Sequence, residues 1–104
     1  MKKTHTRLVE KYIQLLKQKG IAVSDAYVFG SQVKGTARPG SDIDVCIISP
    51  RFGKNRKRER MMLMKYGELI SDDIEPHPYS PEDFKVPYDL LASEIKRTGI
   101  RITA

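Results

Sequence analysis

The sequence predicts a small α/β (α+β) fold in which a mixed β-sheet is flanked by helices. Apolar residues recur at helical spacing within residues 4–19 and 57–71, whereas continuous β-branched apolar runs end at Phe29 and follow Asp42. The chain has 104 residues, of which 39% are hydrophobic and 31% charged. This size and composition suit one modest core in a soluble chain, so we expect a single domain over residues 1–104.

The first half of the chain predicts two helices and two strands. Residues 4–19 are expected to form an amphipathic helix packed on the sheet, with Gly20 in the position that favours glycine after a last helical turn. Residues 21–29 hold the first strand. Residues 42–48 form an almost wholly apolar run, which predicts a strand buried on both faces. The second helix follows at residues 57–71.

An edge strand is predicted within residues 72–79. Pro76 and Pro78 both lack a backbone N–H donor, and in a strand they would lie on one hydrogen-bonding side. Such a segment suits an edge of the sheet and not its centre. Ser80 and Pro81 then have the residue types of an N-cap and a first helical position, which predicts a helix start directly after this strand.

The C-terminal segment predicts one more helix. Pro87 is expected to open it and Gly99 to close it, with apolar residues on one side. Ile100 and Ile102 leave two alternatives open, because they fit either a short closing strand or the start of an oligomer contact.

Several classes of protein do not fit this sequence. No apolar run is long enough for a membrane span, and the charged start lacks the apolar segment of a secretory signal. The lone cysteine, Cys46, cannot form an internal disulfide and is expected in the core of a cytoplasmic protein. No spacing of cysteine and histidine suggests zinc.

Two carboxylates begin the buried strand. Side chains alternate along a strand, so Asp42 and Asp44 are expected on the same side, where they repel each other. A divalent cation would remove that repulsion, and Mg²⁺ commonly shares its ligands with substrate phosphates. The alternative is a strand that starts in a polar loop, with both aspartates in solvent.

A glycine and a serine end the preceding strand. Gly30 permits a tight turn and a close approach by a ligand, and Ser31 can start a helical turn that favours an anion. The alternative is an ordinary serine-capped turn. Because the acidic pair lies eleven residues after Ser31, the combination suggests chemistry on a nucleoside triphosphate.

The motif Gly30-Ser31-x-x-x-Gly35-x-x-x-x-x-Ser41-Asp42-x-Asp44 resembles that of the polymerase-beta-like nucleotidyltransferase superfamily. Within it the chain looks most like the minimal nucleotidyltransferases, many of which are antitoxins encoded beside a helical HEPN-type partner. The resemblance implies that Gly30 and Ser31 hold the triphosphate. It also implies that Asp42 and Asp44 bind two divalent ions, Mg²⁺ or Mn²⁺.

The same resemblance implies a third acid on a later strand. Glu75 is the best match, although most relatives carry aspartate there, and Asp73 is the fallback on the same face. The alternative for Glu75 is a solvated acid in a proline-rich loop. The resemblance also makes phosphate contact plausible for Lys34, Arg38 and Ser41, which belong to the motif or its loop.

His77 would share the face of Glu75 if the segment is extended. In that position it would contact a phosphate or assist proton transfer. A surface histidine is the more common alternative.

The net charge of +6 implies an anionic partner, and much of it lies in a basic run between Lys54 and Arg60. The resemblance favours a nucleotidyltransferase that transfers a nucleoside monophosphate, most simply from ATP, to a hydroxyl that a partner toxin could carry. The alternative is a non-catalytic binding subunit that neutralises its partner. Nucleic-acid binding through the basic run is not favoured, because it leaves the acidic motif unexplained.

Overall fold

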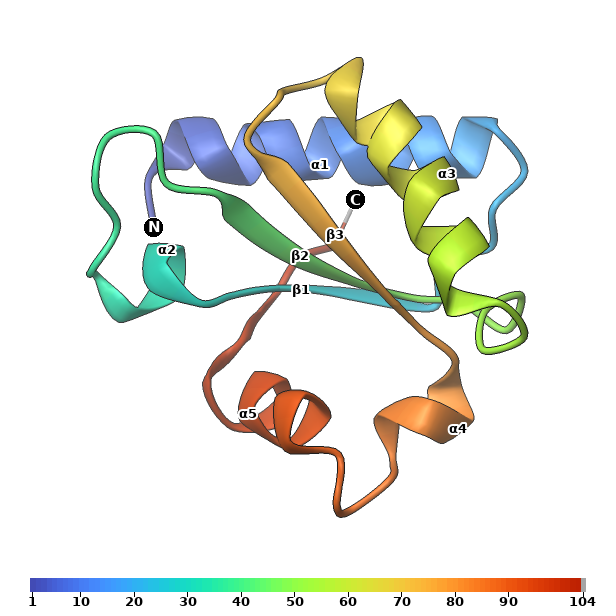
Figure 1. Ribbon diagram of the computed structural model, residues 1–104. Coiled ribbons are helices and arrows are strands. Elements are labelled where there is room, and N and C mark those ends of the chain that lie inside the picture. The colour runs from blue at the N-terminus through green and yellow to red at the C-terminus, as the bar shows by residue number, and fades with distance from the viewer. Residues whose placement is uncertain (104) are drawn as a thin grey trace.

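A computed structural model describes residues 1–103 and contains a four-stranded mixed sheet with helices on both faces (Figure 1). The strand order is β3-β2-β1-β4. The central strand β2 pairs antiparallel with β1 and parallel with β3, and β4 pairs antiparallel with β1. The predicted α/β class is therefore confirmed. The strands are β1 Asp25–Phe29, β2 Ile43–Ile48, β3 Ile74–Tyr79 and β4 Ile100–Arg101.

Helices α1 (Lys3–Gln18) and α3 (Arg56–Glu68) cover one face of the sheet (Figure 1). The amphipathic pattern of α1 is confirmed, since its apolar side is buried and Gly20 follows its end with a φ of +82°. The Tyr12 hydroxyl donates a 2.8 Å hydrogen bond to the Leu63 carbonyl, which ties α1 to α3. This face is closed by apolar packing: Val9, Tyr12, Ile13, Leu16, Val28, Ile43, Val45, Ile47 and Leu63 are all buried.

The opposite face is covered by α4 (Pro81–Phe84) and α5 (Leu90–Thr98) over only part of its length. Ser80 caps α4 as predicted, accepting a 3.0 Å bond from the Asp83 amide. The predicted start of the last helix at Pro87 is wrong. Asp89 caps α5 instead, because its carboxylate accepts from both the Ala92 amide and the Tyr79 hydroxyl.

The edge position of β3 is confirmed. The carbonyls of Asp73 and Tyr79 accept from Ile43 and Ser49 of the β2 segment, so odd-numbered residues of β3 direct their backbone groups toward β2. Pro76 and Pro78 consequently stand on the outer edge, where they remove the N–H groups that another strand would need.

The remaining boundaries differ modestly from the predictions. β1 begins at Asp25, since the Ile21 amide still bonds to the end of α1, and Asp42 lies just before β2. The strand alternative for the C-terminal segment is correct, because β4 pairs with β1. The short helix α2 (Ser31–Lys34) directly follows β1. Within residues 1–103, no helix is both long and apolar enough to cross a bilayer.

Candidate nucleotide and metal site

The candidate site lies at the end of the sheet beside α2, on the face that α4 and α5 leave partly open (Figure 1). The register explains why acids gather there. Asp44 lies opposite Glu75 in the parallel β2–β3 pair and opposite Phe29 in the antiparallel β1–β2 pair. Phe29 is followed at once by Gly30, so the glycine-serine turn and both acids meet at one end of the sheet.

Gly30 has to be glycine for two reasons. Its φ of +78° is a conformation that L side chains rarely adopt. In addition, a Cβ atom at this position would lie 2.5 Å from the Asp44 Oδ2 atom. The turn therefore places its backbone directly against one of the predicted metal-binding carboxylates.

Asp44, Glu75 and His77 form a compact cluster, with one potential ligand atom from each residue within 4.8 Å of the others. The His77 Nε2 atom lies 3.2 Å from the Asp44 Oδ1 atom. The imidazole packs edge-on against the Phe29 ring, with 5.0 Å between the ring centroids. His77 faces the carboxylates as the strand alternation predicts, and its side chain is only 21% exposed, so the surface alternative is wrong.

Asp42 adds a third carboxylate from the segment that precedes β2, and it is exposed. The pKa of Glu75 is raised, first by burial, then by its hydrogen bond with Asp42 and by the negative charge of Asp44, while His77 lowers it. Crowded carboxylates with this effect on one another suit a cation. The three predicted acids Asp42, Asp44 and Glu75 are thus brought together.

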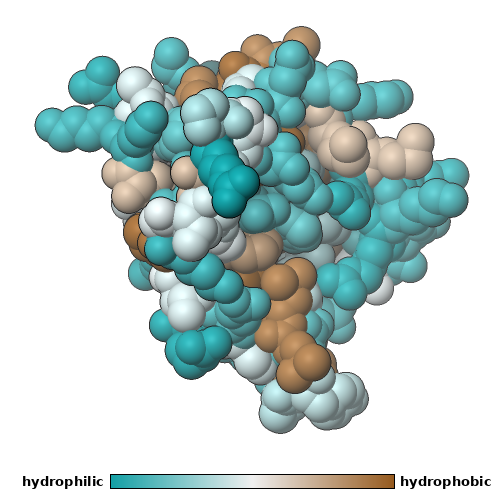
Figure 2. Space-filling view, turned by 60° about the vertical axis from the view of Figure 1, so that its left-hand side comes forward, coloured by the Kyte–Doolittle hydropathy of each residue, from teal (hydrophilic) through white to brown (hydrophobic). Residues whose placement is uncertain are grey.

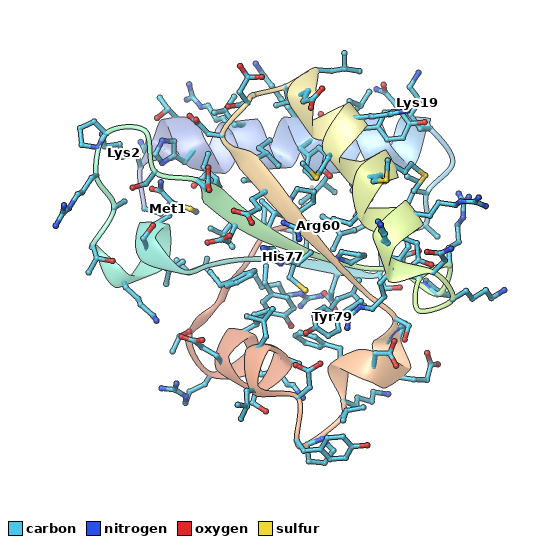
Figure 3. All side chains as sticks on the ribbon, viewed as in Figure 1. Met1, Lys2, Lys19, Arg60, His77 and Tyr79 are labelled. Carbon is cyan, nitrogen blue, oxygen red and sulfur yellow. The ribbon has the colours of Figure 1, made fainter. Side chains whose placement is uncertain are left out.

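Arg60 reaches this cluster from α3, and its guanidinium donates a 3.0 Å hydrogen bond to the Glu75 carboxylate. Figure 3 shows Arg60 beside His77, with Tyr79 farther along β3. Arg56, one helical turn earlier, lies 4.6 Å from the centre of the Tyr79 ring and bonds to the Pro78 carbonyl. The basic run is therefore not simply a solvated segment, because two of its arginines contact the edge strand.

Sequence reasoning treated these two arginines only as part of the basic run. Their spacing of four residues places them on one face of a helix, which was an available signal. That this face lies over β3 follows only from tertiary packing.

A groove of about 570 Å³ begins at His77 and follows the outer side of β3 between α3 and α5. Figure 2 brings the α2 end of the sheet toward the viewer, where mostly hydrophilic side chains lie above and an apolar strip runs below, at the height of α5. The groove has basic and apolar walls formed by Arg56, Lys57, Arg60, Met61, Met64, His77, Pro78, Tyr79 and Leu91.

The other predicted residues lie around the cluster and not in it. Lys34 forms a 2.7 Å ion pair with Glu94 of α5. Arg38, Ser41 and Asp73 line a separate hollow of about 310 Å³ near the start of α1. The Ser41 hydroxyl accepts a bond from the Arg38 amide and so closes its own turn.

Gln32 is a positioning residue that sequence reasoning missed. It is buried in α2, and its amide donates long hydrogen bonds of 3.5 and 3.4 Å to the carbonyls of Ser41 and Asp42. These bonds connect the turn after β1 to the segment that carries the first acid. The only signal in the sequence was a glutamine between the two motif glycines Gly30 and Gly35.

The sequence profile of the nucleotidyltransferase domain matches residues 9–103, nearly the whole chain. The chain belongs to the nucleotidyltransferase domain family. A comparison with curated proteins gives no match. The family assignment agrees with the fold.

Several solved structures share this fold. A toxin–antitoxin crystallised with AMP-PNP is 22% identical, with a TM-score of 0.67 over 91% of this chain and 73% of that one. The toxin–antitoxin MntA-HepT is 17% identical, with a TM-score of 0.63 over 99% of this chain and 73% of that one. A Sulfolobus solfataricus protein with a proposed nucleotidyltransferase function is 15% identical, with a TM-score of 0.62 over 94% of this chain and 78% of that one.

Proposed function

We propose that this nucleotidyltransferase-family chain transfers a nucleoside monophosphate from a triphosphate, most simply ATP, to a hydroxyl on a partner protein. The observation that carries the proposal is the meeting of Gly30 with Asp44 and Glu75 at one end of the sheet. A turn suited to phosphate, set directly against acids suited to a metal ion, supports a site for a metal-bound phosphate. The AMP-PNP and the toxin–antitoxin pairing of the structural relatives support the nucleotide and the partner.

The donor set fits a divalent ion such as Mg²⁺ or Mn²⁺. Asp42, Asp44 and Glu75 offer carboxylate oxygens, the ligands that hard cations prefer, and the raised pKa of Glu75 reports the burial and crowding of negative charge there. Bound ions would lower the pKa of the acceptor hydroxyl and stabilise the leaving pyrophosphate. Of the two acids considered for the third position, Glu75 and not Asp73 belongs to the cluster.

Residues from different strands would have different roles in the reaction. Gly30 and Ser31, at the end of β1, bind the phosphates, and Lys34 and the loop residues Arg38 and Ser41 supply further contacts. Glu75, on β3, would accept the proton of the acceptor hydroxyl, because its carboxylate lies in the acidic cluster on the side of the groove. The acceptor oxygen then bonds to the α-phosphorus while the bond from that phosphorus to the pyrophosphate oxygen breaks.

The strand order would let the nucleotide and the acceptor reach the site from different sides. β2 lies between β1 and β3, so Asp44 stands between the glycine-serine turn and the groove that begins at His77. A nucleotide held at the turn leaves the groove free for the acceptor. The arginines on the groove wall suit an acidic segment of a partner protein.

The Asp44→Asn variant tests the proposal, with Asp72→Asn as the matched control in the exposed turn before β3. We expect metal-dependent ATP binding by the wild type and by the control, measured by calorimetry, and a loss of at least about a hundredfold in Asp44→Asn. Incubation with a helical partner protein should add one adenylyl group to the partner, detected by mass spectrometry. Absence of ATP binding by the wild type would favour the binding-subunit alternative.

A further inference from the structure

His77 contributes the one nitrogen atom to the cluster with Asp44 and Glu75, whose other potential ligand atoms are carboxylate oxygens. Its Nε2 atom and the Asp44 Oδ1 atom are 3.2 Å apart. Two ligands at right angles on an octahedral ion, each about 2.1 Å from it, lie about 3.0 Å apart. The two side chains therefore already have nearly the separation of neighbouring ligands on one ion.

The surroundings hold the imidazole in this orientation. The Phe29 ring packs against it at an interplanar angle of 61°. The backbone of His77 is held by the pairing of β3 with β2. Both the His77 and the Asp44 side chains remain about one-fifth to one-quarter exposed, at 21% and 24%. The cluster is therefore ordered but open, as an exchangeable ion requires.

Arg60 leaves Glu75 able to take part. The guanidinium bonds to one carboxylate oxygen, Oε1, so the other oxygen can face an ion. Arg60 also offsets part of the negative charge of three neighbouring acids.

We propose that His77 is a direct metal ligand, so that the centre carries a mixed imidazole and carboxylate donor set and selects Mn²⁺ over Mg²⁺. This inference rests on the proposed function, because it assumes that the acidic cluster holds an ion. Mg²⁺ prefers oxygen ligands and gives up water reluctantly, whereas imidazole nitrogen favours first-row transition ions. An ion bound at Nε2 would require the proton of the neutral imidazole to be on Nδ1.

The His77→Gln variant separates ligation from simple orientation. Glutamine can still hydrogen-bond to Asp44, but it lacks the aromatic nitrogen. We expect calorimetry to show that the wild type binds Mn²⁺ about tenfold or more tightly than Mg²⁺. In His77→Gln that ratio should fall to about threefold or less while Mg²⁺ affinity changes little. His5→Gln removes the other histidine, on α1, and should leave both affinities unchanged.

Pulsed electron paramagnetic resonance gives a direct readout on the Mn²⁺-loaded protein. A nitrogen coupling in the wild type that disappears in His77→Gln would establish ligation. An unchanged metal ratio in His77→Gln, or no nitrogen coupling in the wild type, would overturn the inference and leave His77 as a residue that orients Asp44. If Asp44→Asn binds both ions as well as the wild type does, the acidic site itself fails, which is a different outcome.

Discussion

The two faces of the sheet differ in how far apolar packing closes them. Beneath α1 and α3, Val28, Val45 and Ile47 are fully buried along the whole length of the central strands. On the other face the same alternation of β2 places Asp44 and Cys46 two residues apart in very different surroundings. Cys46 is fully buried, whereas the Asp44 side chain is 24% exposed. The site thus begins where the packing of α5 ends.

The buried and the open parts of this face also differ in the ionisation of their side chains. Burial raises the pKa of the Cys46 thiol to about 12, with smaller opposing contributions from Arg56 and Asp89, so this thiol stays protonated and inert at neutral pH. One β-strand period away, crowded acids and an imidazole remain within reach of solvent and a ligand. The candidate site therefore lies at the open end of one face and does not interrupt the buried core beneath α1 and α3.

The largest expected effect comes from opening the closed face. Leu63 of α3 is fully buried, so Leu63→Ala should lower the free energy of unfolding by about 2–5 kcal/mol, as measured by urea denaturation. Met64→Ala, at the next residue and 40% exposed, is the control and should change it by less than about 0.5 kcal/mol. Equal losses in the two variants would contradict the assignment of the core to this face.

Gly30 offers the next largest effect, at the open end. Gly30→Ala strains a φ of +78° and drives a methyl group into the Asp44 carboxylate, so it should cost about 1–3 kcal/mol and weaken metal binding. Gly20→Ala shares a positive φ of +82° but meets no atom within 4 Å. The control should lose about 1 kcal/mol in thermal unfolding and keep its metal affinity. Loss of metal affinity in Gly20→Ala would mean that strain alone disturbs the site.

Local patterns predicted most of the fold and the core of the site. Alternation along β3 was sufficient to place Glu75 and His77 on one face, and the missing N–H groups of Pro76 and Pro78 were sufficient to place β3 at an edge. Ser80 was recognisable as a helix N-cap because Pro81 follows it directly in the sequence. Each of these properties depends on residues close together in the sequence.

Features that depend on distant contacts were not predictable. Asp73 and Glu75 share the same alternation, and only the parallel register with Asp44 brings Glu75 into the cluster. Likewise α5 starts at Asp89 and not near Pro87, because the cap is completed by the hydroxyl of Tyr79 on β3. The contact of Arg60 with Glu75 follows from the packing of α3 over the sheet edge.

The smallest expected effect on stability concerns Lys34, which joins α2 at the open end to Glu94 on α5. Lys34 lowers the pKa of Glu94, first through its hydrogen bond and then through its charge, and Arg97 lowers it slightly. Such a pair stabilises the fold only above the ordinary pKa of the carboxylate, and the stabilisation is lost as the pH falls through the lowered value. Because both side chains are exposed, we expect unchanged thermal midpoints for Lys34→Met and Glu94→Gln.

The same two variants distinguish a structural role of Lys34 from a role at the phosphates. Glu94→Gln frees the ammonium group, whereas Lys34→Met removes it. If Lys34 contacts the triphosphate, Lys34→Met should weaken metal-dependent ATP binding by up to about fivefold, and Glu94→Gln should leave it equal or tighter. Equal ATP affinity in both variants and the wild type, measured by calorimetry, would restrict Lys34 to the ion pair. In that case the open end of the sheet would bind its nucleotide through the glycine-serine turn and the acidic cluster alone.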